Sequence, residues 1–303
     1  MIRSPTTEKR VQFDFEIEFS NGGGLQGRAF RLDIDGDEID DDALADLIVR
    51  DLRLLMVGAV RIRNKTVIAE AHKRGLIANT AGMDASRFVD LSHTIEDGMI
   101  TYKGLPAPLI CDHLSREQSR AHYAAGTEFQ IGRITMVANT GTYIDSPFHR
   151  YADGGDIADF DLSELASLEG IVVRVAGMRD RAIPRSAFAP FDVRGKAVLV
   201  HTDWSTHWRT DQYFEGHPFL TADAATFLRD AGARIVGIDS HNIDDIADGT
   251  RPVHTTLLGA GIPIVEHLCN LDRLPISGFR FSAVPPKVRG MGTFPVRAFA
   301  VLD

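Results

Sequence analysis

Alternating and helical patterns in the first 70 residues predict a small α+β module. Four apolar side chains alternate with acidic or polar ones, a period of two that is typical of a half-buried strand. They are Phe13, Phe15, Ile17 and Phe19. Residues 21–24 (NGGG) supply the backbone freedom of a turn, and residues 29–34 are expected to form the returning strand.

A helix and a further strand are expected next. Apolar residues between Ala43 and Leu55 recur at helical spacing, and three aspartates at 40–42 stand where a helix N-terminus favours acids. Residues 57–71 are predicted to form one strand or a pair of strands that turns at Asn64-Lys65. The order is therefore ββαβ, and residues 72–87, which mix charge, glycine and small side chains, are interpreted as a linker.

From Phe88 onward short apolar strands alternate with helices, which predicts an α/β domain with a mixed sheet. The strands are expected at 170–176, 197–201, 234–238 and 296–302. The clearest helix runs from the N-cap Thr221 to a stop at Gly232. We expect two domains, an N-terminal module with its linker over 1–82 and a larger α/β domain over 83–303.

Composition narrows the class of protein. The 303 residues carry a net charge of −9, which argues against a nucleic-acid partner. The two cysteines, Cys111 and Cys269, form neither a disulfide framework nor a metal-binding pair. The N-terminal sequence leads into charge, and no run approaches 18 apolar residues, so neither a signal peptide nor a membrane span is expected. We predict a cytoplasmic protein that acts on a small molecule.

The densest polar cluster lies in residues 139–149 (NTGTYIDSPFH). Asp145 and His149 are four residues apart across Pro147, so they are expected to project from a loop or strand end. A carboxylate and an imidazole in such a place can act as an acid/base pair or as metal ligands. The plain alternative is an aspartate that caps a turn beside a surface histidine.

A second polar set ends a buried stretch. Residues 262–265 should form a buried strand, and Glu266 at its end needs a partner because an unpaired buried carboxylate is costly. That partner is a backbone amide, an arginine such as Arg251, or a metal ion shared with His254 and Asp145. His241 follows another strand end, where open sheets tend to bind ligands.

Residues 139–149 also resemble the signature H-x-G-T-H-x-D-x-P-x-H of the cyclase or kynurenine formamidase-like metal-dependent hydrolase family. The resemblance spans about 88–302 and includes 89–99, 237–240, 281–287 and 295–298. It implies a swivelling β/β/α fold, a homodimer or homotetramer, and a divalent metal, commonly zinc or manganese. It also implies hydrolysis of an amide, formamide or lactam by metal-activated water.

The resemblance assigns roles by position. Asp145, His254 and Glu266 would be metal ligands and His149 the general acid/base. Three further residues are expected to bind substrate, namely Tyr102, Phe148 and His241.

Three positions depart from the family pattern. The first two signature histidines are Asn139 and Tyr143 here, a possible additional site of weak ligands, so we expect one Mn²⁺ or Zn²⁺ rather than a tight two-zinc centre. Asp203 stands where many members have glycine, and we expect it to cap the next helix, with metal ligation as the alternative.

The predicted function is therefore a hydrolase of a C–N bond other than a peptide bond, of cyclic amidase or arylformamidase type, or of an ester-like bond. Its substrate would be a small cyclic or aromatic molecule. Two alternatives stay open. One is a metal-independent dehydratase, isomerase or cyclase that uses His149, Asp145 and Tyr143 as acids and bases. The other is a non-catalytic ligand-binding homologue.

Overall fold

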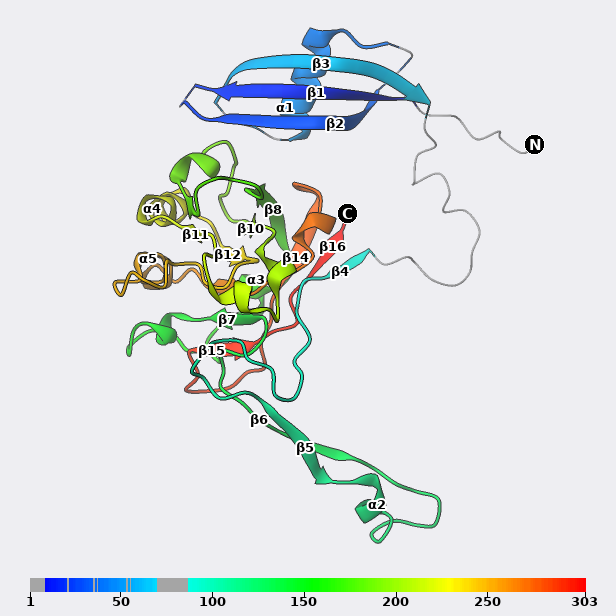
Figure 1. The fold of residues 1–303 in the computed structure, drawn as a ribbon, viewed down its shortest axis with the longest axis vertical. Helices are drawn as coiled ribbons and strands as arrows, with labels where there is room; N and C mark the ends of the chain where they lie inside the picture. Colours follow the sequence, from blue (N-terminus) through cyan, green and yellow to red (C-terminus); the bar gives the residue numbers. More distant parts are fainter. Residues whose placement is uncertain are drawn as a thin grey trace, which may run out of the picture. The chain divides into compact units, whose positions relative to one another are not determined.

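The computed structural model describes residues 9–20, 22–34, 36, 38–52, 54, 56–69 and 87–303. The chain divides into two compact units, Met1–Arg87 with Ser186–Asp192, and Phe88–Arg185 with Val193–Asp303 (Figure 1). Apart from Arg87, the expected linker at 72–87 lies outside the described residues. Among the described residues, no helix is long and apolar enough to cross a membrane.

The first unit follows the order strand, strand, helix, strand. Its elements are β1 (Lys9–Phe19), β2 (Gly24–Ile34), α1 (Asp41–Asp51) and β3 (Val57–Ala69), and the antiparallel sheet has the order β2-β1-β3. The four alternating apolar residues of β1 are all buried, as are Leu44 and Ile48 of α1. The Asp40 carboxylate caps α1 by accepting a hydrogen bond from the Ala43 amide at 2.7 Å.

The expected turn at Asn64-Lys65 is wrong, because β3 is one continuous strand. Its register against β1 shifts between Gln12, which pairs with Thr66, and Asp14, which pairs with Arg63. Asn64 has φ +52° and donates to Asp14 Oδ2 at 2.7 Å. An asparagine that tolerates a left-handed backbone serves a β-bulge as well as a turn, so the local signal did not distinguish them.

The second unit is a mixed α/β structure built on a nine-stranded sheet that curls into a half-barrel. In spatial order the strands are β15 (Thr293–Pro295), β7 (Tyr143–Asp145), β13 (Ile264–Glu266), β12 (Ile235–Ile238), β10 (Ala197–His201), β8 (Leu168–Arg174), β14 (Phe279–Ser282), β16 (Phe299–Leu302) and β4 (Phe88–Asp90). The run from β13 to β8 is parallel and every other pairing is antiparallel, so the predicted mixed sheet is confirmed.

Two helices of the second unit, α4 (Ala222–Ala231) and α5 (Pro252–Gly259), pack against each other. Helix α4 begins at the predicted N-cap Thr221 and ends at Gly232, whose φ is +82°. The remaining short elements are α2 (Arg116–Ser119), α3 (Leu162–Leu165), the strand pair β9 (Ala182–Ile183) and β11 (Phe219–Leu220), and the 3₁₀ turns η2 (Pro147–His149), η3 (Arg185–Ala187), η4 (Trp204–His207), η5 (Asp211–Phe214) and η6 (Leu271–Arg273).

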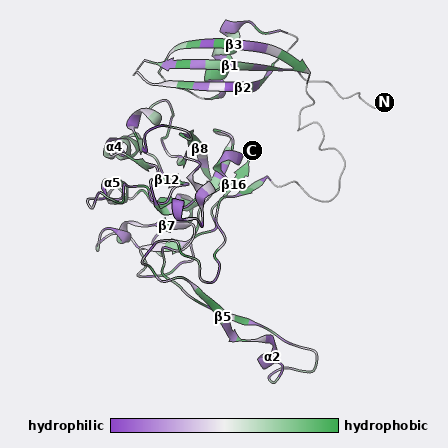
Figure 2. Ribbon diagram, viewed as in Figure 1, coloured by the Kyte–Doolittle hydropathy of each residue, from purple (hydrophilic) through white to green (hydrophobic). Residues whose placement is uncertain are grey.

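A hairpin arm projects from this unit. It consists of β5 (Leu109–Leu114), α2 and β6 (Ile131–Thr135) (Figure 1). Hydrophobic residues colour β5 green in Figure 2, and several apolar side chains on the arm are exposed, among them Leu109, Ile131 and Ile134. The arm connects the loop that carries Tyr102 to the 139–149 segment.

Candidate active site

The register of three neighbouring strands assembles the acidic part of the site. Strand β7 lies between β13 and β15, so Tyr143 pairs with Glu266, and Asp145 pairs with Thr293. Ile144 faces the hydrophobic core, so its two neighbours on β7 point to the opposite side of the sheet. Tyr143 therefore lies next to Glu266, and Asp145 next to Thr293, on the face of the sheet that carries the site.

Asp145 is fully buried, and only one of its two carboxylate oxygens has a hydrogen-bond partner among the described residues. Its Oδ1 accepts a hydrogen bond from Thr293 Oγ1 at 2.5 Å, whereas Oδ2 has no hydrogen-bond partner among the described residues. Because the Thr293 hydroxyl has one hydrogen, its 2.9 Å contact with His149 Nδ1 requires that His149 donates. The other ring nitrogen, Nε2, is then free to accept a proton, and the His149 side chain is 37% exposed.

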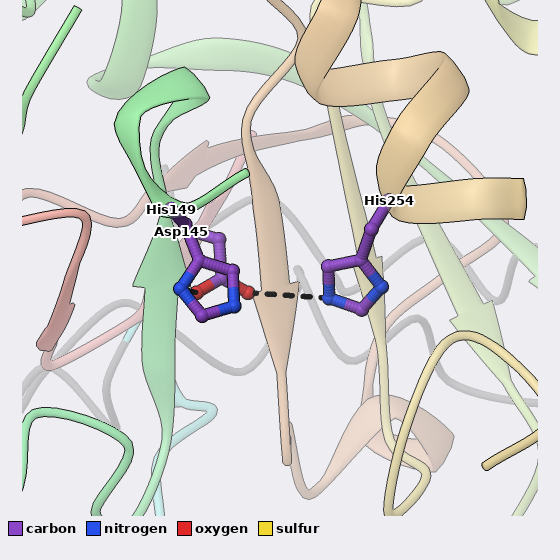
Figure 3. A group of neighbouring side chains, drawn as sticks. All are labelled: Asp145, His149 and His254. Atoms are coloured by element: carbon purple, nitrogen blue, oxygen red, sulfur yellow. Dashed lines mark ion pairs between the residues drawn. The ribbon is translucent and has the colours of Figure 1, made fainter. Parts of the chain in front are cut away.

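His254 faces Asp145 from the first turn of α5 (Figure 3). Asp244 orients it, because its carboxylate accepts hydrogen bonds from the Val253 amide at 2.7 Å, the His254 amide at 3.0 Å and His254 Nδ1 at 2.6 Å. His254 Nε2 then points to two carboxylates, 3.7 Å from Asp145 Oδ2 and 3.8 Å from Glu266 Oε1. A carboxylate behind an imidazole is the usual support of a metal-ligating histidine.

Glu266 is fully buried at the end of β13. The expected backbone partner is present, since Oε1 accepts the Ile243 amide at 2.7 Å. The expected arginine is not the partner, because Arg251 instead donates to Asn242 Oδ1 at 3.0 Å. Oε2 accepts the Tyr143 hydroxyl at 2.5 Å.

The buried carboxylates of the site favour a positive charge beside them. Burial lowers the pKa of His254, but the carboxylates of Asp145, Asp244 and Glu266 outweigh it and raise that pKa to about 10. Burial raises the pKa of Glu266 despite the opposing effect of His254. Burial, with the charge of Glu266, raises the pKa of the Tyr143 hydroxyl well above its usual value, so this phenol stays protonated.

The donor set fits a divalent metal ion. Ligand atoms of Asp145, His149 and His254 lie within 4.8 Å of one another, whereas Glu266, the third expected ligand, is outside that group and lies 3.8 Å from His254 Nε2. Tetrahedral ligand atoms around zinc stand roughly 3.4 Å apart, close to the separations of His254 Nε2 from the two carboxylate oxygens. The unpartnered buried Oδ2 of Asp145 is the kind of atom that a cation satisfies.

Of the three expected substrate-binding residues, two come together. The Tyr102 hydroxyl donates to the His241 carbonyl at 2.8 Å, and the two rings are 4.6 Å apart. Burial lowers the pKa of His241 to about 3, so its ring is neutral. Phe148 is exposed beside His149, and in the described part of the chain no ring contact joins it to Tyr102 or His241.

Asn139 and Asp203, two of the three positions that depart from the family pattern, have different surroundings. Asn139 is half-buried, and no hydrogen bond of its side chain to another described residue is found. Asp203 stands at the N-cap position of η4, but its side chain does not make the capping hydrogen bond that was expected. Asp203 has φ +66° and no side-chain cap, and its amide donates to Asp239 Oδ2 at 3.0 Å. A left-handed backbone is a position that glycine or aspartate tolerates, which accounts for the residue type there.

Sequence reasoning missed Asp244 and Thr293. Asp244 precedes His254 by ten residues, and Thr293 lies 148 residues after Asp145. Neither spacing belongs to a local motif, because tertiary folding creates both contacts.

Replacement of Asp244 by asparagine should weaken metal binding. Asp244→Asn keeps one acceptor oxygen but places an NH₂ group against either the Val253 amide or the His254 N–H groups, so the hold on the helix start or on the His254 tautomer is weakened. We expect a loss of about 10–100-fold in metal affinity, measured by calorimetry. Asp245→Asn is the control, because Asp245 bonds the Ala247 amide instead. Equal affinities of wild type and Asp244→Asn would show that Asp244 does not position a ligand.

Comparison with known proteins now assigns the family. The family model "Putative cyclase" matches residues 89–245, more than half of the chain. The chain belongs to this cyclase family. A kynurenine formamidase from Bacillus cereus (strain ATCC 14579) is 29% identical over 217 residues, 71% of this chain and 98% of the relative. A kynurenine formamidase from Bacillus mycoides is 28% identical over the same shares of the two chains.

Two solved structures share the fold over about 70% of this chain. A potential metal-dependent hydrolase with cyclase activity is 28% identical with a TM-score of 0.58, over 70% of this chain and 96% of the other. Isatin hydrolase A from Labrenzia aggregata has a TM-score of 0.61 at 21% identity, over 71% and 93%. The family resemblance derived from residues 139–149 is therefore confirmed.

Proposed function

We propose that this protein is a metal-dependent hydrolase that cleaves an amide, formamide, lactam or ester-like bond in a small cyclic or aromatic molecule. The observation that carries the proposal is that two buried carboxylate oxygens, Asp145 Oδ2 and Glu266 Oε1, both face His254 Nε2, with the exposed His149 beside Asp145. The kynurenine formamidase relatives support a C–N bond as the target.

Asp145, His254 and Glu266 would hold the ion. A divalent ion there would polarise the substrate carbonyl and lower the pKa of water. His149 acts as the acid/base, because Nε2 is the ring nitrogen left without a proton by the Thr293 contact. It takes a proton from the attacking water and returns it to the leaving nitrogen or oxygen. Thr293 positions the ring throughout.

The metal-independent alternative is less well supported. It needs the Tyr143 phenol to reach the substrate, but Tyr143 is 1% exposed and donates its hydrogen to Glu266. Tyr102 is half-buried and therefore more open to a substrate than Tyr143, whereas His241 is only 3% exposed and contacts the Tyr102 ring beneath the surface.

Metal removal tests the proposal. Wild-type protein would be assayed on a panel of aryl formamides, aryl lactams and aryl esters, as prepared, after chelation and after reloading with Mn²⁺ or Zn²⁺. We expect hydrolysis of at least one class, its loss on chelation and its recovery on reloading. Turnover that survives complete chelation would support the metal-independent alternative. Ligand binding without turnover across the panel would support a binding protein.

A further inference from the structure

We infer that the centre holds a single divalent ion and that the Tyr143 hydroxyl fixes Glu266 so that only one of its oxygens can bind it. The inference rests on the proposed function, since it assumes an ion at Asp145, His254 and Glu266. It adds structural grounds for the single ion expected from the sequence, and a positioning residue that is not itself a ligand.

The two oxygens of Glu266 have different surroundings. Oε1 accepts one main-chain hydrogen bond, from Ile243, and faces His254 Nε2. Oε2 accepts the Tyr143 hydroxyl and lies 3.2 Å from the Tyr102 hydroxyl and 3.4 Å from Asn242 Nδ2. Tyr143 and Asn242 direct hydrogens at Oε2, and the Tyr102 hydroxyl, which gives its hydrogen to the His241 carbonyl, lies against it, so Oε1 is the oxygen that faces the ion site.

Asp145 repeats this division. Thr293 holds Oδ1, while Oδ2 is buried without a partner and faces the same nitrogen of His254. Each carboxylate therefore has one oxygen held by a protein hydroxyl and a second oxygen that faces His254, which is unpartnered in Asp145 and accepts one main-chain amide in Glu266. Both of these oxygens face His254 Nε2, at 3.7 and 3.8 Å, and among the described residues only one group of three potential ligands lies together, that of Asp145, His149 and His254.

The number of negative charges at the site also favours one divalent ion. Asp145 and Glu266 together carry two negative charges when ionised, and one divalent ion neutralises them. The third carboxylate nearby, Asp244, is on the far side of the His254 ring, where it accepts three N–H groups. A second divalent ion would leave uncompensated positive charge in a buried site, which is costly.

Tyr143 is held in place by its neighbours. It is paired with Glu266 across strands β7 and β13, and its hydroxyl is 2.8 Å from the Tyr102 hydroxyl. The Tyr102 hydroxyl in turn accepts from Asn242 Nδ2 at 3.0 Å. A phenol whose single hydrogen is directed at a carboxylate cannot offer a ligand as imidazole does. At the second histidine position of the signature, this chain therefore places a donor to Glu266.

Ion stoichiometry and affinity test the inference. The chelator-treated full-length protein would be titrated with Mn²⁺ and with Zn²⁺ by calorimetry, and bound metal counted by elemental analysis. Tyr143→Phe keeps the ring and removes the hydroxyl. Tyr151→Phe is the matched control, since the Tyr151 hydroxyl donates to the Thr255 carbonyl and does not touch Glu266. Melting temperatures of the metal-free proteins report on the fold of each variant.

We expect one ion per chain in the wild type and in both variants, with an affinity about 10–100-fold lower in Tyr143→Phe and unchanged in Tyr151→Phe. Two ions per wild-type chain would overturn the inference and leave the proposed function standing. Wild-type affinity in Tyr143→Phe would overturn the role of the hydroxyl, and so would an equal loss in both variants. No ion in the wild type would overturn the inference and the metal-dependent function together.

Discussion

Replacement of Asp145 by asparagine should abolish metal binding and turnover while leaving the metal-free fold at least as stable as the wild type. The carboxylate is buried and its Oδ2 has no hydrogen-bond partner among the described residues. Loss of a ligand removes the charge stabilisation that an ion gives to the transition state. This stabilisation of the transition state amounts to several kcal/mol, so its loss should lower turnover by at least about 10³-fold.

The expected stability of Asp145→Asn follows from the charges around His254. Three carboxylates, those of Asp145, Asp244 and Glu266, face one imidazole. Without metal, a protonated His254 compensates only one of them. The neutral amide of Asp145→Asn removes part of the remaining repulsion. We therefore expect a metal-free melting temperature no lower than that of wild type, measured by calorimetry.

Asp239→Asn is the contrasting control for this prediction. Asp239 is also fully buried, but its carboxylate accepts hydrogen bonds from the Thr202 amide at 2.6 Å and the Asp203 amide at 3.0 Å. We expect Asp239→Asn to lose about 1–3 kcal/mol of stability and to keep its metal. An Asp145→Asn variant that still binds one ion, or that melts well below wild type, would contradict the assignment of Asp145.

Much of the fold was predictable because its signals are local. The alternation from Phe13 to Phe19 is a property of one strand, and the caps Asp40 and Thr221 act within a few residues of themselves. The same locality explains the errors. At Asn64 a left-handed residue suits a turn or a bulge, and only the pairing with β1 decides between them.

The candidate site was predictable only where a motif encodes it. Asp145 and His149 lie in one short segment, and the family resemblance added His254 and Glu266. The supporting residues Asp244 and Thr293 meet the site through the start of α5 and the β7–β15 pairing. Such contacts depend on strand register, which a single sequence does not specify. The hairpin arm likewise could not be read from the hydrophobic pattern, since its apolar residues are exposed.

The second large effect concerns the core beneath the site. Phe279 on β14 is fully buried in the cluster that also contains Ile144 and Val265, the neighbours of Asp145 and Glu266. Its truncation in Phe279→Ala should cost about 3–5 kcal/mol of unfolding free energy, through lost burial and a cavity, measured by denaturant titration. Phe129→Ala is the control, because Phe129 is 53% exposed, and it should change stability by about 0.5 kcal/mol or less.

Gly170 on β8 makes this prediction more specific. A Cβ at Gly170 would lie 2.1 Å from the Phe279 ring, so the ring fills the space that the glycine leaves. Gly170→Ala alone should cost about 1–3 kcal/mol through overpacking. In combination with Phe279→Ala the added methyl group meets a cavity instead, so the double variant should be less destabilised than the sum of the two single changes. Additive free energies would show that the two positions are not in contact. Coupling would establish that β8 and β14 approach closely at these two positions, in the same sheet that carries Asp145 and Glu266.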